Sequence, residues 1–268
     1  MQGKRNIRLL IQYEGGAYHG WQIQPGALTI QEVLEETLSR ITQERTRLIG
    51  AGRTDAGVHA LAQVANLHTG SSLPARTIQR ALNALLPHDI RVLMAEEIDR
   101  AFHARFSALA KRYEYRIWNH PVESVFQRRY SWWIPRTLDL EAMRAAAQSL
   151  LGEHDFLAFK ASGSDAKSTV RRIVGCGWEA WGPLLVFWIE ATGFLRYMVR
   201  GLVGTLVEIG LGKKETDHLE KLLVSGERSL SGPTAPARGL FLTKVVYPEK
   251  WSFGKQWEEQ PWRGFPGI

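Results

Sequence analysis

The chain has 268 residues, of which 44% are hydrophobic and 10% aromatic. This composition can bury one large core or two smaller ones, and it excludes a disordered or fibrous protein. The formal net charge of +7 is compatible with an anionic partner, although many ordinary soluble proteins carry a surplus of this size.

Strands and helices alternate along the first 110 residues. Apolar side chains occupy every second position in residues 6–13, which predicts a half-buried strand. Thr29 and Glu32 form a capping-box pattern, and apolar residues follow at helical spacing as far as Ile41. Because a second helix begins near Pro74 and Pro87 ends it, the predicted order is β-α-β-β-α-β over residues 6–13, 29–41, 47–49, 61–68, 74–86 and 90–98.

The same order repeats beyond residue 110. We predict strand 112–118, helix 139–151, a hairpin of strands 170–180 and 184–191, helices 194–209 and 215–224, and strand 240–247. Each half then has the order of a ferredoxin-like unit. The predicted fold class is α+β: two ferredoxin-like subdomains form one extended, mostly antiparallel sheet with helices on one face and the other face open to a large partner.

The predicted domain boundaries follow from this order. The N-terminal subdomain covers residues 1–110 and contains a candidate catalytic loop at 50–60, and the C-terminal subdomain covers 111–247. The tail, 248–268, has no convincing periodicity but contains Trp251, Trp257 and Trp262. We expect it to dock on the protein surface or on a partner subunit, since a disordered tail seldom carries three tryptophans.

Positive charge is concentrated in one segment. Between Arg100 and Arg136 there are eight basic residues and two acidic ones, and tyrosines and tryptophans are interleaved with them. Such a segment can neutralise phosphates and stack on bases. It can equally be a solvated strand face with half-buried aromatic residues.

The candidate catalytic loop contains three glycines, two small alanines, a cation and a carboxylate between two predicted strands. Val58 stands where a phosphate-binding loop requires lysine, and no helix follows, so nucleoside triphosphate and dinucleotide sites are both excluded. What remains is a backbone that can approach a ligand closely and presents Asp55 at its apex. The alternative is a turn in which Asp55 only caps backbone N–H groups.

Cofactor and compartment predictions rest on simple counts. Cys176 is the only cysteine, which excludes an intrachain disulfide and a cysteine-rich zinc site and fits a reducing cytosol. The eight histidines include no pair at metalloprotease spacing, and no stretch approaches the roughly 18 apolar residues of a membrane span. We therefore expect a soluble cytoplasmic protein without a metal or a membrane contact.

The loop sequence Gly52-Arg53-Thr54-Asp55-Ala56-Gly57-Val58-His59-Ala60 closely resembles the active-site motif of the tRNA pseudouridine synthase A (TruA) family. The resemblance extends over nearly the whole chain apart from the tail. It includes further blocks at residues 13–15, 20–22, 102–108, 111–115, 154–159, 194–200 and 235–240.

The resemblance implies an enzyme that isomerises uridines at positions 38 to 40 of the tRNA anticodon stem-loop. It also implies a homodimer, two ferredoxin-like subdomains in each chain, and no cofactor. The reaction breaks the N1–C1′ bond and joins C5 to C1′. By its match to the motif, Asp55 either attacks C1′ or removes a C2′ proton, and the sequence leaves both routes open.

The resemblance assigns roles to other residues, and each has a simpler alternative. Arg200 matches the cation that keeps the aspartate ionised; otherwise it lies on an exposed helix stripe. Tyr113 matches a tyrosine that stacks on the extruded uracil; otherwise it is an inward-facing strand residue. Arg53 fills the gap left by the flipped base, or else contacts a phosphate. Leu240 is expected to line the uracil pocket, and Arg105 and Arg112 are proposed phosphate contacts.

Two rival functions remain at this stage. One is a non-catalytic RNA-binding protein of the same fold, against which the intact Asp55 motif argues. The other is a hydrolase of a small glycoside or ester, which ordinarily needs a second acidic group that the loop lacks.

Overall fold

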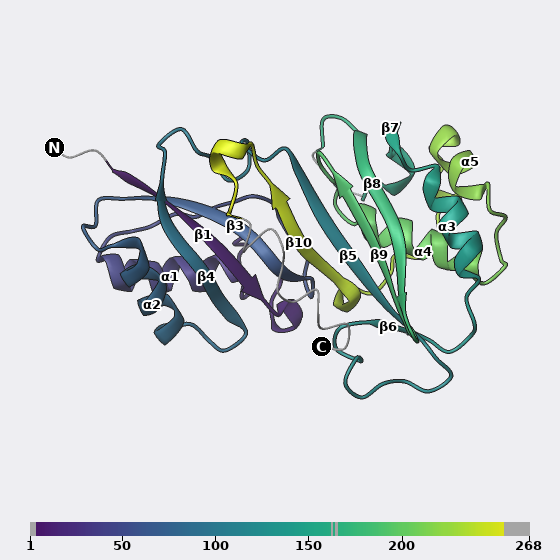
Figure 1. Ribbon diagram of the computed structural model, residues 1–268, viewed down its shortest axis with the longest axis horizontal. Helices are drawn as coiled ribbons and strands as arrows, with labels where there is room; N and C mark the ends of the chain where they lie inside the picture. The colour runs from purple at the N-terminus through teal and green to yellow at the C-terminus, as the bar shows by residue number, and fades with distance from the viewer. Residues whose placement is uncertain (1–3, 162, 164–165, 255–268) are drawn as a thin grey trace. The chain divides into compact units, whose positions relative to one another are not determined.

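The computed structural model describes residues 4–161, 163 and 166–254. These residues divide into two compact units, drawn from Met1–Leu109 with Phe241–Ser252 and from Ala110–Leu240 with Phe253–Ile268 (Figure 1). The sequence-based boundaries put the whole last strand in the second subdomain. In the structure all of that strand except Leu240 belongs to the first unit.

The first unit is built on a mostly antiparallel sheet. Strand β1 (Arg5–Tyr13) pairs antiparallel with both β3 (His59–Thr69) and β4 (Ile90–Ile98). Two more strands pair with β3: β2 (Ile49–Gly50) runs antiparallel to it, and β10 (Leu240–Val246) runs parallel to it. The order β4-β1-β3-β2 is that of a ferredoxin-like unit.

The helices of the first unit begin where the sequence predicts. Helix α1 (Ile30–Thr42) starts after Thr29, whose hydroxyl accepts a hydrogen bond from the backbone N–H of Glu32 at 3.3 Å. Its buried stripe consists of Ile30, Leu34, Thr37 and Leu38. Helix α2 (Ala75–Leu85) follows Pro74, and the side-chain amide of Asn83 exchanges hydrogen bonds with the backbone of Val92 in β4. These two hydrogen bonds hold α2 against β4, the edge strand of this sheet.

The second unit contains a sheet in the order β5-β9-β8-β7, all pairs of which are antiparallel. Its strands are β5 (Ala110–Asn119), β7 (Gly152–Asp155), β8 (Val170–Trp181) and β9 (Leu184–Ala191), and the short β6 (Trp132–Ile134) runs parallel to β5. Figure 1 shows helices α3 (Leu140–Gln148), α4 (Met198–Gly210) and α5 (His218–Ser225) grouped together beside β8 and β9. The predicted α+β class with mostly antiparallel strands is confirmed.

Two helices begin later than predicted, and α5 starts at His218 rather than at residue 215. The apolar periodicity predicts a helix from residue 194, but α4 begins at Met198. Tyr197 adopts a left-handed conformation with φ of 64°, which interrupts helical hydrogen bonding at that point. The strands β6 and β7 were also missed, because three- and four-residue strands with polar or aromatic side chains leave no readable alternation.

Part of the tail docks on the first unit. Residues Glu249–Trp251 form a short 3₁₀ turn, and the Trp251 ring meets the Phe102 ring edge-on at a centroid distance of 5.6 Å. Trp257 and Trp262 lie outside the described residues. Among the described residues no helix combines the length and the apolarity needed to cross a membrane.

Cys176 offers a test of the packing of the second unit. Its buried thiol donates to the backbone carbonyl of Ala147 at 3.2 Å, and burial raises the thiol pKa to about 11. Because the thiolate is the reactive form, we expect native protein at pH 8 to resist iodoacetamide and denatured protein to be alkylated rapidly. Mass spectrometry of both samples checks this; equal alkylation of the native protein would contradict the packing.

Candidate active site

The Asp55 loop joins β2 to β3 within the first unit. Asp55 is half-buried, whereas Arg53 and Ala56 are exposed. The backbone N–H of Val58 donates to the carbonyl of Asp55 at 3.1 Å, closing a tight turn in which Gly57 has φ of +76°. A side chain other than glycine is strained in that conformation, so Gly57 is required by the turn that presents Asp55.

The segment just after β1 is hydrogen-bonded to this loop through its backbone. The N–H of Trp21 donates to the carbonyl of Thr54 at 3.1 Å, and the N–H of Gly57 donates to the carbonyl of Tyr18 at 3.2 Å. The two backbones are so close that a Cβ on Gly20 would lie 2.5 Å from the Thr54 carbonyl oxygen. Glycine at this position therefore permits the close approach that holds the loop.

Behind the loop, buried polar side chains bind its other face. The Tyr13 hydroxyl lies 2.7 Å from Thr54 Oγ1, and Gln63 Nε2 donates to the carbonyl of Gly52 at 2.8 Å. Burial raises the pKa of Tyr13 above its usual range, so this hydroxyl stays protonated. No sequence pattern indicated a role for Tyr13 or Gln63 in this site. The available signal was a glutamine between the apolar residues Ala62 and Val64 of β3.

His59 follows the loop and is a hydrogen-bonded core residue. Its Nδ1 accepts the backbone N–H of Gly15 at 3.1 Å, and its ring stacks on Phe241 at 4.7 Å between centroids. In the described part of the chain no group of three or more His, Cys, Asp or Glu side chains is arranged to hold a metal ion.

Arg200 lies in the second unit, on the first turns of α4. Its Nε donates to the carbonyl of Ala235 at 2.7 Å, and its guanidinium carbon lies 5.0 Å from the centre of the Tyr197 ring. The side chain is half-buried, and the rest of α4 is apolar apart from Thr205 and Glu208. The alternative of an exposed helix stripe is therefore wrong.

Tyr115 completes this cluster and was missed by the sequence analysis. The fully buried side chain donates its hydroxyl to the carbonyl of Pro236 at 2.8 Å. Burial raises the pKa of Tyr115, and the positive charges of Arg200 and Arg238 oppose that rise without cancelling it. Within this unit Arg200 and Tyr115 thus both bind the segment that leads into Leu240, which is itself buried.

The Tyr113 ring lies two residues earlier on β5 and packs edge-on against Phe194 at 5.0 Å between centroids. It is buried. Its burial matches the alternative interpretation, in which Tyr113 is an inward-facing strand residue. Stacking on a base remains a prediction for this residue.

The two proposed phosphate contacts differ in their surroundings. Arg112 forms an ion pair with Glu190 at 3.0 Å, across the β5–β9 pair, and stacks over the Trp188 ring at 4.5 Å. Arg105 is exposed in the first unit and lies 5.6 Å from the ring of Phe106, which is 78% exposed. An exposed cation beside an exposed aromatic ring suits a nucleic acid better than a cation already paired with a carboxylate.

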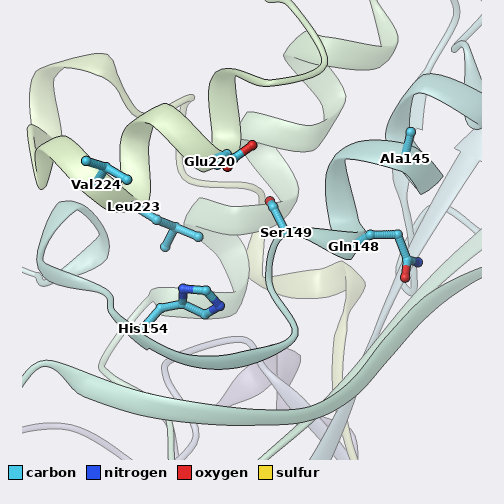
Figure 2. Close-up of a pocket in the computed structure, with 7 residues that line it drawn as sticks. All are labelled: Ala145, Gln148, Ser149, His154, Glu220, Leu223 and Val224. Carbon is cyan, nitrogen blue, oxygen red and sulfur yellow. The ribbon is translucent and has the colours of Figure 1, made fainter.

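A separate hollow of about 450 Å³ lies between α3, β7 and α5 of the second unit (Figure 2). It contains none of the predicted site residues. Its lining consists of Ala145, Gln148, Ser149, His154, Glu220, Leu223 and Val224.

Comparison with known proteins identifies the family. A family model described as tRNA pseudouridine synthase matches residues 9–107 and 146–248. The tRNA pseudouridine synthase A of Thermoanaerobacter sp. (strain X514) is 46% identical over 243 residues, which are 91% of this chain and 100% of that protein. The protein of the same name from Citrifermentans bemidjiense is 47% identical over 247 residues, 92% of this chain and 99% of that one.

A solved structure shows only a distant likeness. The archaeal box H/ACA sRNP Nop10–Cbf5 complex contains a chain that matches with a TM-score of 0.34 and 11% identity, covering 83% of this chain and 60% of that one. The family model and the close relatives confirm the resemblance of the loop motif. The chain belongs to the tRNA pseudouridine synthase family, enzymes that isomerise uridine to pseudouridine in tRNA.

Proposed function

We propose that this enzyme modifies uridines at positions 38 to 40 of the tRNA anticodon stem-loop, with Asp55 as the essential carboxylate. The observation that carries the proposal is the Asp55 loop itself. Its apex is half-buried and turned by Gly57, and the residues before and after it are bound by backbone and side-chain hydrogen bonds. A rigid backbone of this kind can hold one carboxylate in a fixed position against a sugar.

The chemistry needs no change of oxidation state. The N1–C1′ bond breaks, a C5–C1′ bond forms, the proton on C5 is released to water, and N1 gains a proton. Asp55 acts either by attacking C1′ or by removing a proton from C2′, and both routes require its ionised form. We assign Arg200 as the cation that keeps the carboxylate ionised. This role follows from the match to the family motif, and a cation beside a carboxylate favours its ionised form.

The target uridine lies in a paired stem, so it has to leave the helix before the carboxylate can reach C1′. Arg53 is exposed two residues before Asp55, and we assign it to the gap that the flipped base leaves. Tyr113 stacks on the extruded uracil, and Leu240 lines the pocket that receives it. These two roles follow from the match to the family motif.

The same proposal covers the remaining partners. Arg105 and Arg112 contact tRNA phosphates, with Arg105 favoured by its exposure. The protein acts as a homodimer in the cytoplasm, without a metal or other cofactor. A non-catalytic RNA-binding role gains no support from any feature of the loop.

The position of the modified uridines tests the proposal. Purified protein is incubated with unmodified transcripts of bulk tRNA, and pseudouridine is mapped at single-nucleotide resolution. We expect new pseudouridine at positions 38, 39 and 40 and at no other site. Modification confined to another arm of tRNA would overturn the assignment to the anticodon stem-loop while leaving the enzyme class intact.

Basic residues of the 100–136 segment should govern the salt dependence of tRNA binding. Arg128 and Arg129 are both exposed. Each phosphate that a cation neutralises releases about one counterion when tRNA binds. If Arg128 and Arg129 each neutralise one phosphate, reversing both to glutamate should reduce the slope of log affinity against log salt by about 2. Filter binding at several salt concentrations measures it. The matched control reverses Arg76 and Arg80, which are exposed on α2; an equal fall in the control would move the RNA surface out of this segment.

A further inference from the structure

Three buried polar side chains form a chain of hydrogen bonds behind the Asp55 loop. Gln63 is fully buried in β3, and Tyr13 at the end of β1 is 4% exposed. The third member, Thr54, is 6% exposed and immediately precedes Asp55. Burying polar groups costs desolvation free energy unless their hydrogen bonds are satisfied inside the protein. A buried polar cluster at this position therefore suggests a functional role.

Gln63, Tyr13 and Thr54 are linked by consecutive hydrogen bonds. Gln63 Oε1 accepts the N–H of Val64 at 3.2 Å, which fixes the orientation of its side-chain amide. Gln63 Nε2 then donates to the carbonyl of Gly52 at 2.8 Å and lies 3.5 Å from the Tyr13 hydroxyl. The Tyr13 hydroxyl is in turn hydrogen-bonded to Thr54 Oγ1 at 2.7 Å, and either hydroxyl can be the donor of that bond.

The partners of these side chains show which part of the loop is held in place. The chain of hydrogen bonds binds the carbonyl of Gly52 and the side chain of Thr54, on either side of the exposed Arg53 and next to Asp55. Arg53 and Asp55, two of the side chains proposed to act on the nucleotide, therefore extend from backbone that Gln63 and Tyr13 keep in place. Displacements of about 1 Å at a reacting group can cost on the order of 100-fold in rate.

We propose that Tyr13 and Gln63 are positioning residues for the isomerisation, acting through Thr54 to hold the Asp55 carboxylate where it meets the sugar. This inference rests on the proposed role of Asp55. If Tyr13 is a positioning residue, loss of its hydroxyl slows the chemical step and leaves tRNA affinity unchanged. A purely structural hydrogen bond would not affect the rate in this selective way.

The test uses Tyr13→Phe in the full-length protein. We expect the single-turnover rate of tritium release from tRNA labelled at uracil C5 to fall between about 10-fold and 100-fold, with the tRNA Kd changed less than twofold. Thr54→Val should reproduce this loss and Thr54→Ser should restore most of the rate. The double variant Tyr13→Phe/Thr54→Val should be no slower than either single variant, because both remove the same hydrogen bond.

Tyr247→Phe is the matched control. Tyr247 is 6% exposed in the same unit, and its hydroxyl donates to the carbonyl of Ala104 at 2.7 Å, far along the chain from the loop. We expect it to lower the melting temperature about as much as Tyr13→Phe does, without slowing the chemical step.

Equal single-turnover rates for Tyr13→Phe, Tyr247→Phe and the unchanged enzyme would overturn the positioning role and leave only a structural one. If Tyr13→Phe fails to fold, Thr54→Val and Thr54→Ser decide the same question, since equal rates for these two also overturn it. Failure of the proposed function looks different: Asp55→Ala would then retain activity, whatever the Tyr13 variants do.

Discussion

Asp55→Ala should abolish tritium release from tRNA labelled at uracil C5, by at least about 10⁴-fold, while tRNA affinity and melting temperature change little. The essential carboxylate is lost, so neither attack on C1′ nor removal of a C2′ proton can take place. The turn itself survives, because it is closed between the backbone N–H of Val58 and the backbone carbonyl of Asp55. Phosphate contacts elsewhere maintain binding.

Asp55→Asn distinguishes this role from a structural one. An asparagine oxygen can cap backbone N–H groups as an aspartate does, but it is neither a nucleophile nor a base. If Asp55 only caps the turn, the asparagine variant keeps its activity and the alanine variant loses stability. If Asp55 performs the chemistry, both variants are inactive and both melt near the temperature of the unchanged protein. Tritium release and a thermal melt on the two proteins decide between these outcomes.

Local patterns in the sequence were enough for most of the fold. The position of β1, the Thr29 cap of α1 and the hairpin of β8 and β9 are each determined by neighbouring residues, and each is found where expected. The prediction that β1 is half-buried was wrong, because Asn6, Arg8 and Leu10 on its second face are buried as well. The start of α4 was wrong because Tyr197 adopts a left-handed conformation that propensity does not anticipate in a non-glycine residue. What decides that conformation lies outside the local sequence.

The supports of the candidate site were not readable for the same reason. Tyr13 and Thr54 are 41 positions apart, and Tyr115 and Pro236 are separated by 121. Tyr113 and Tyr115 occupy the same face of β5, so the sequence pattern could not indicate which of them meets the 235–240 segment. Motifs predicted the residues proposed to touch the substrate, whereas the side chains that hold them were found only in the folded chain.

The second large effect is expected on stability, from Gly204→Ala in α4. A Cβ on Gly204 would lie 1.6 Å from the carbonyl oxygen of Pro233, and this contact is to backbone that cannot rotate away. The neighbouring Gly232 N–H is bound to Thr205 Oγ1 at 2.9 Å, which holds the segment against the helix. Alanine gains about 1 kcal/mol in helix propensity, but overpacking of this severity costs roughly 3 kcal/mol, so we expect a net loss of about 2 kcal/mol.

Gly210→Ala is the control for this prediction. It lies on the same helix, and its Cβ would meet mainly the flexible end of Met143, 2.5 Å from Sδ, so repacking should make the loss much smaller. Chemical denaturation of both variants measures the difference in unfolding free energy. Gly204→Ala should also slow the isomerisation, because moving the 233–235 backbone withdraws the Ala235 carbonyl from Arg200. A Gly204→Ala protein as stable as Gly210→Ala would mean that the 233–235 backbone moves away from α4 at little cost. The position of Arg200 would then not depend on the contact between Gly204 and Pro233.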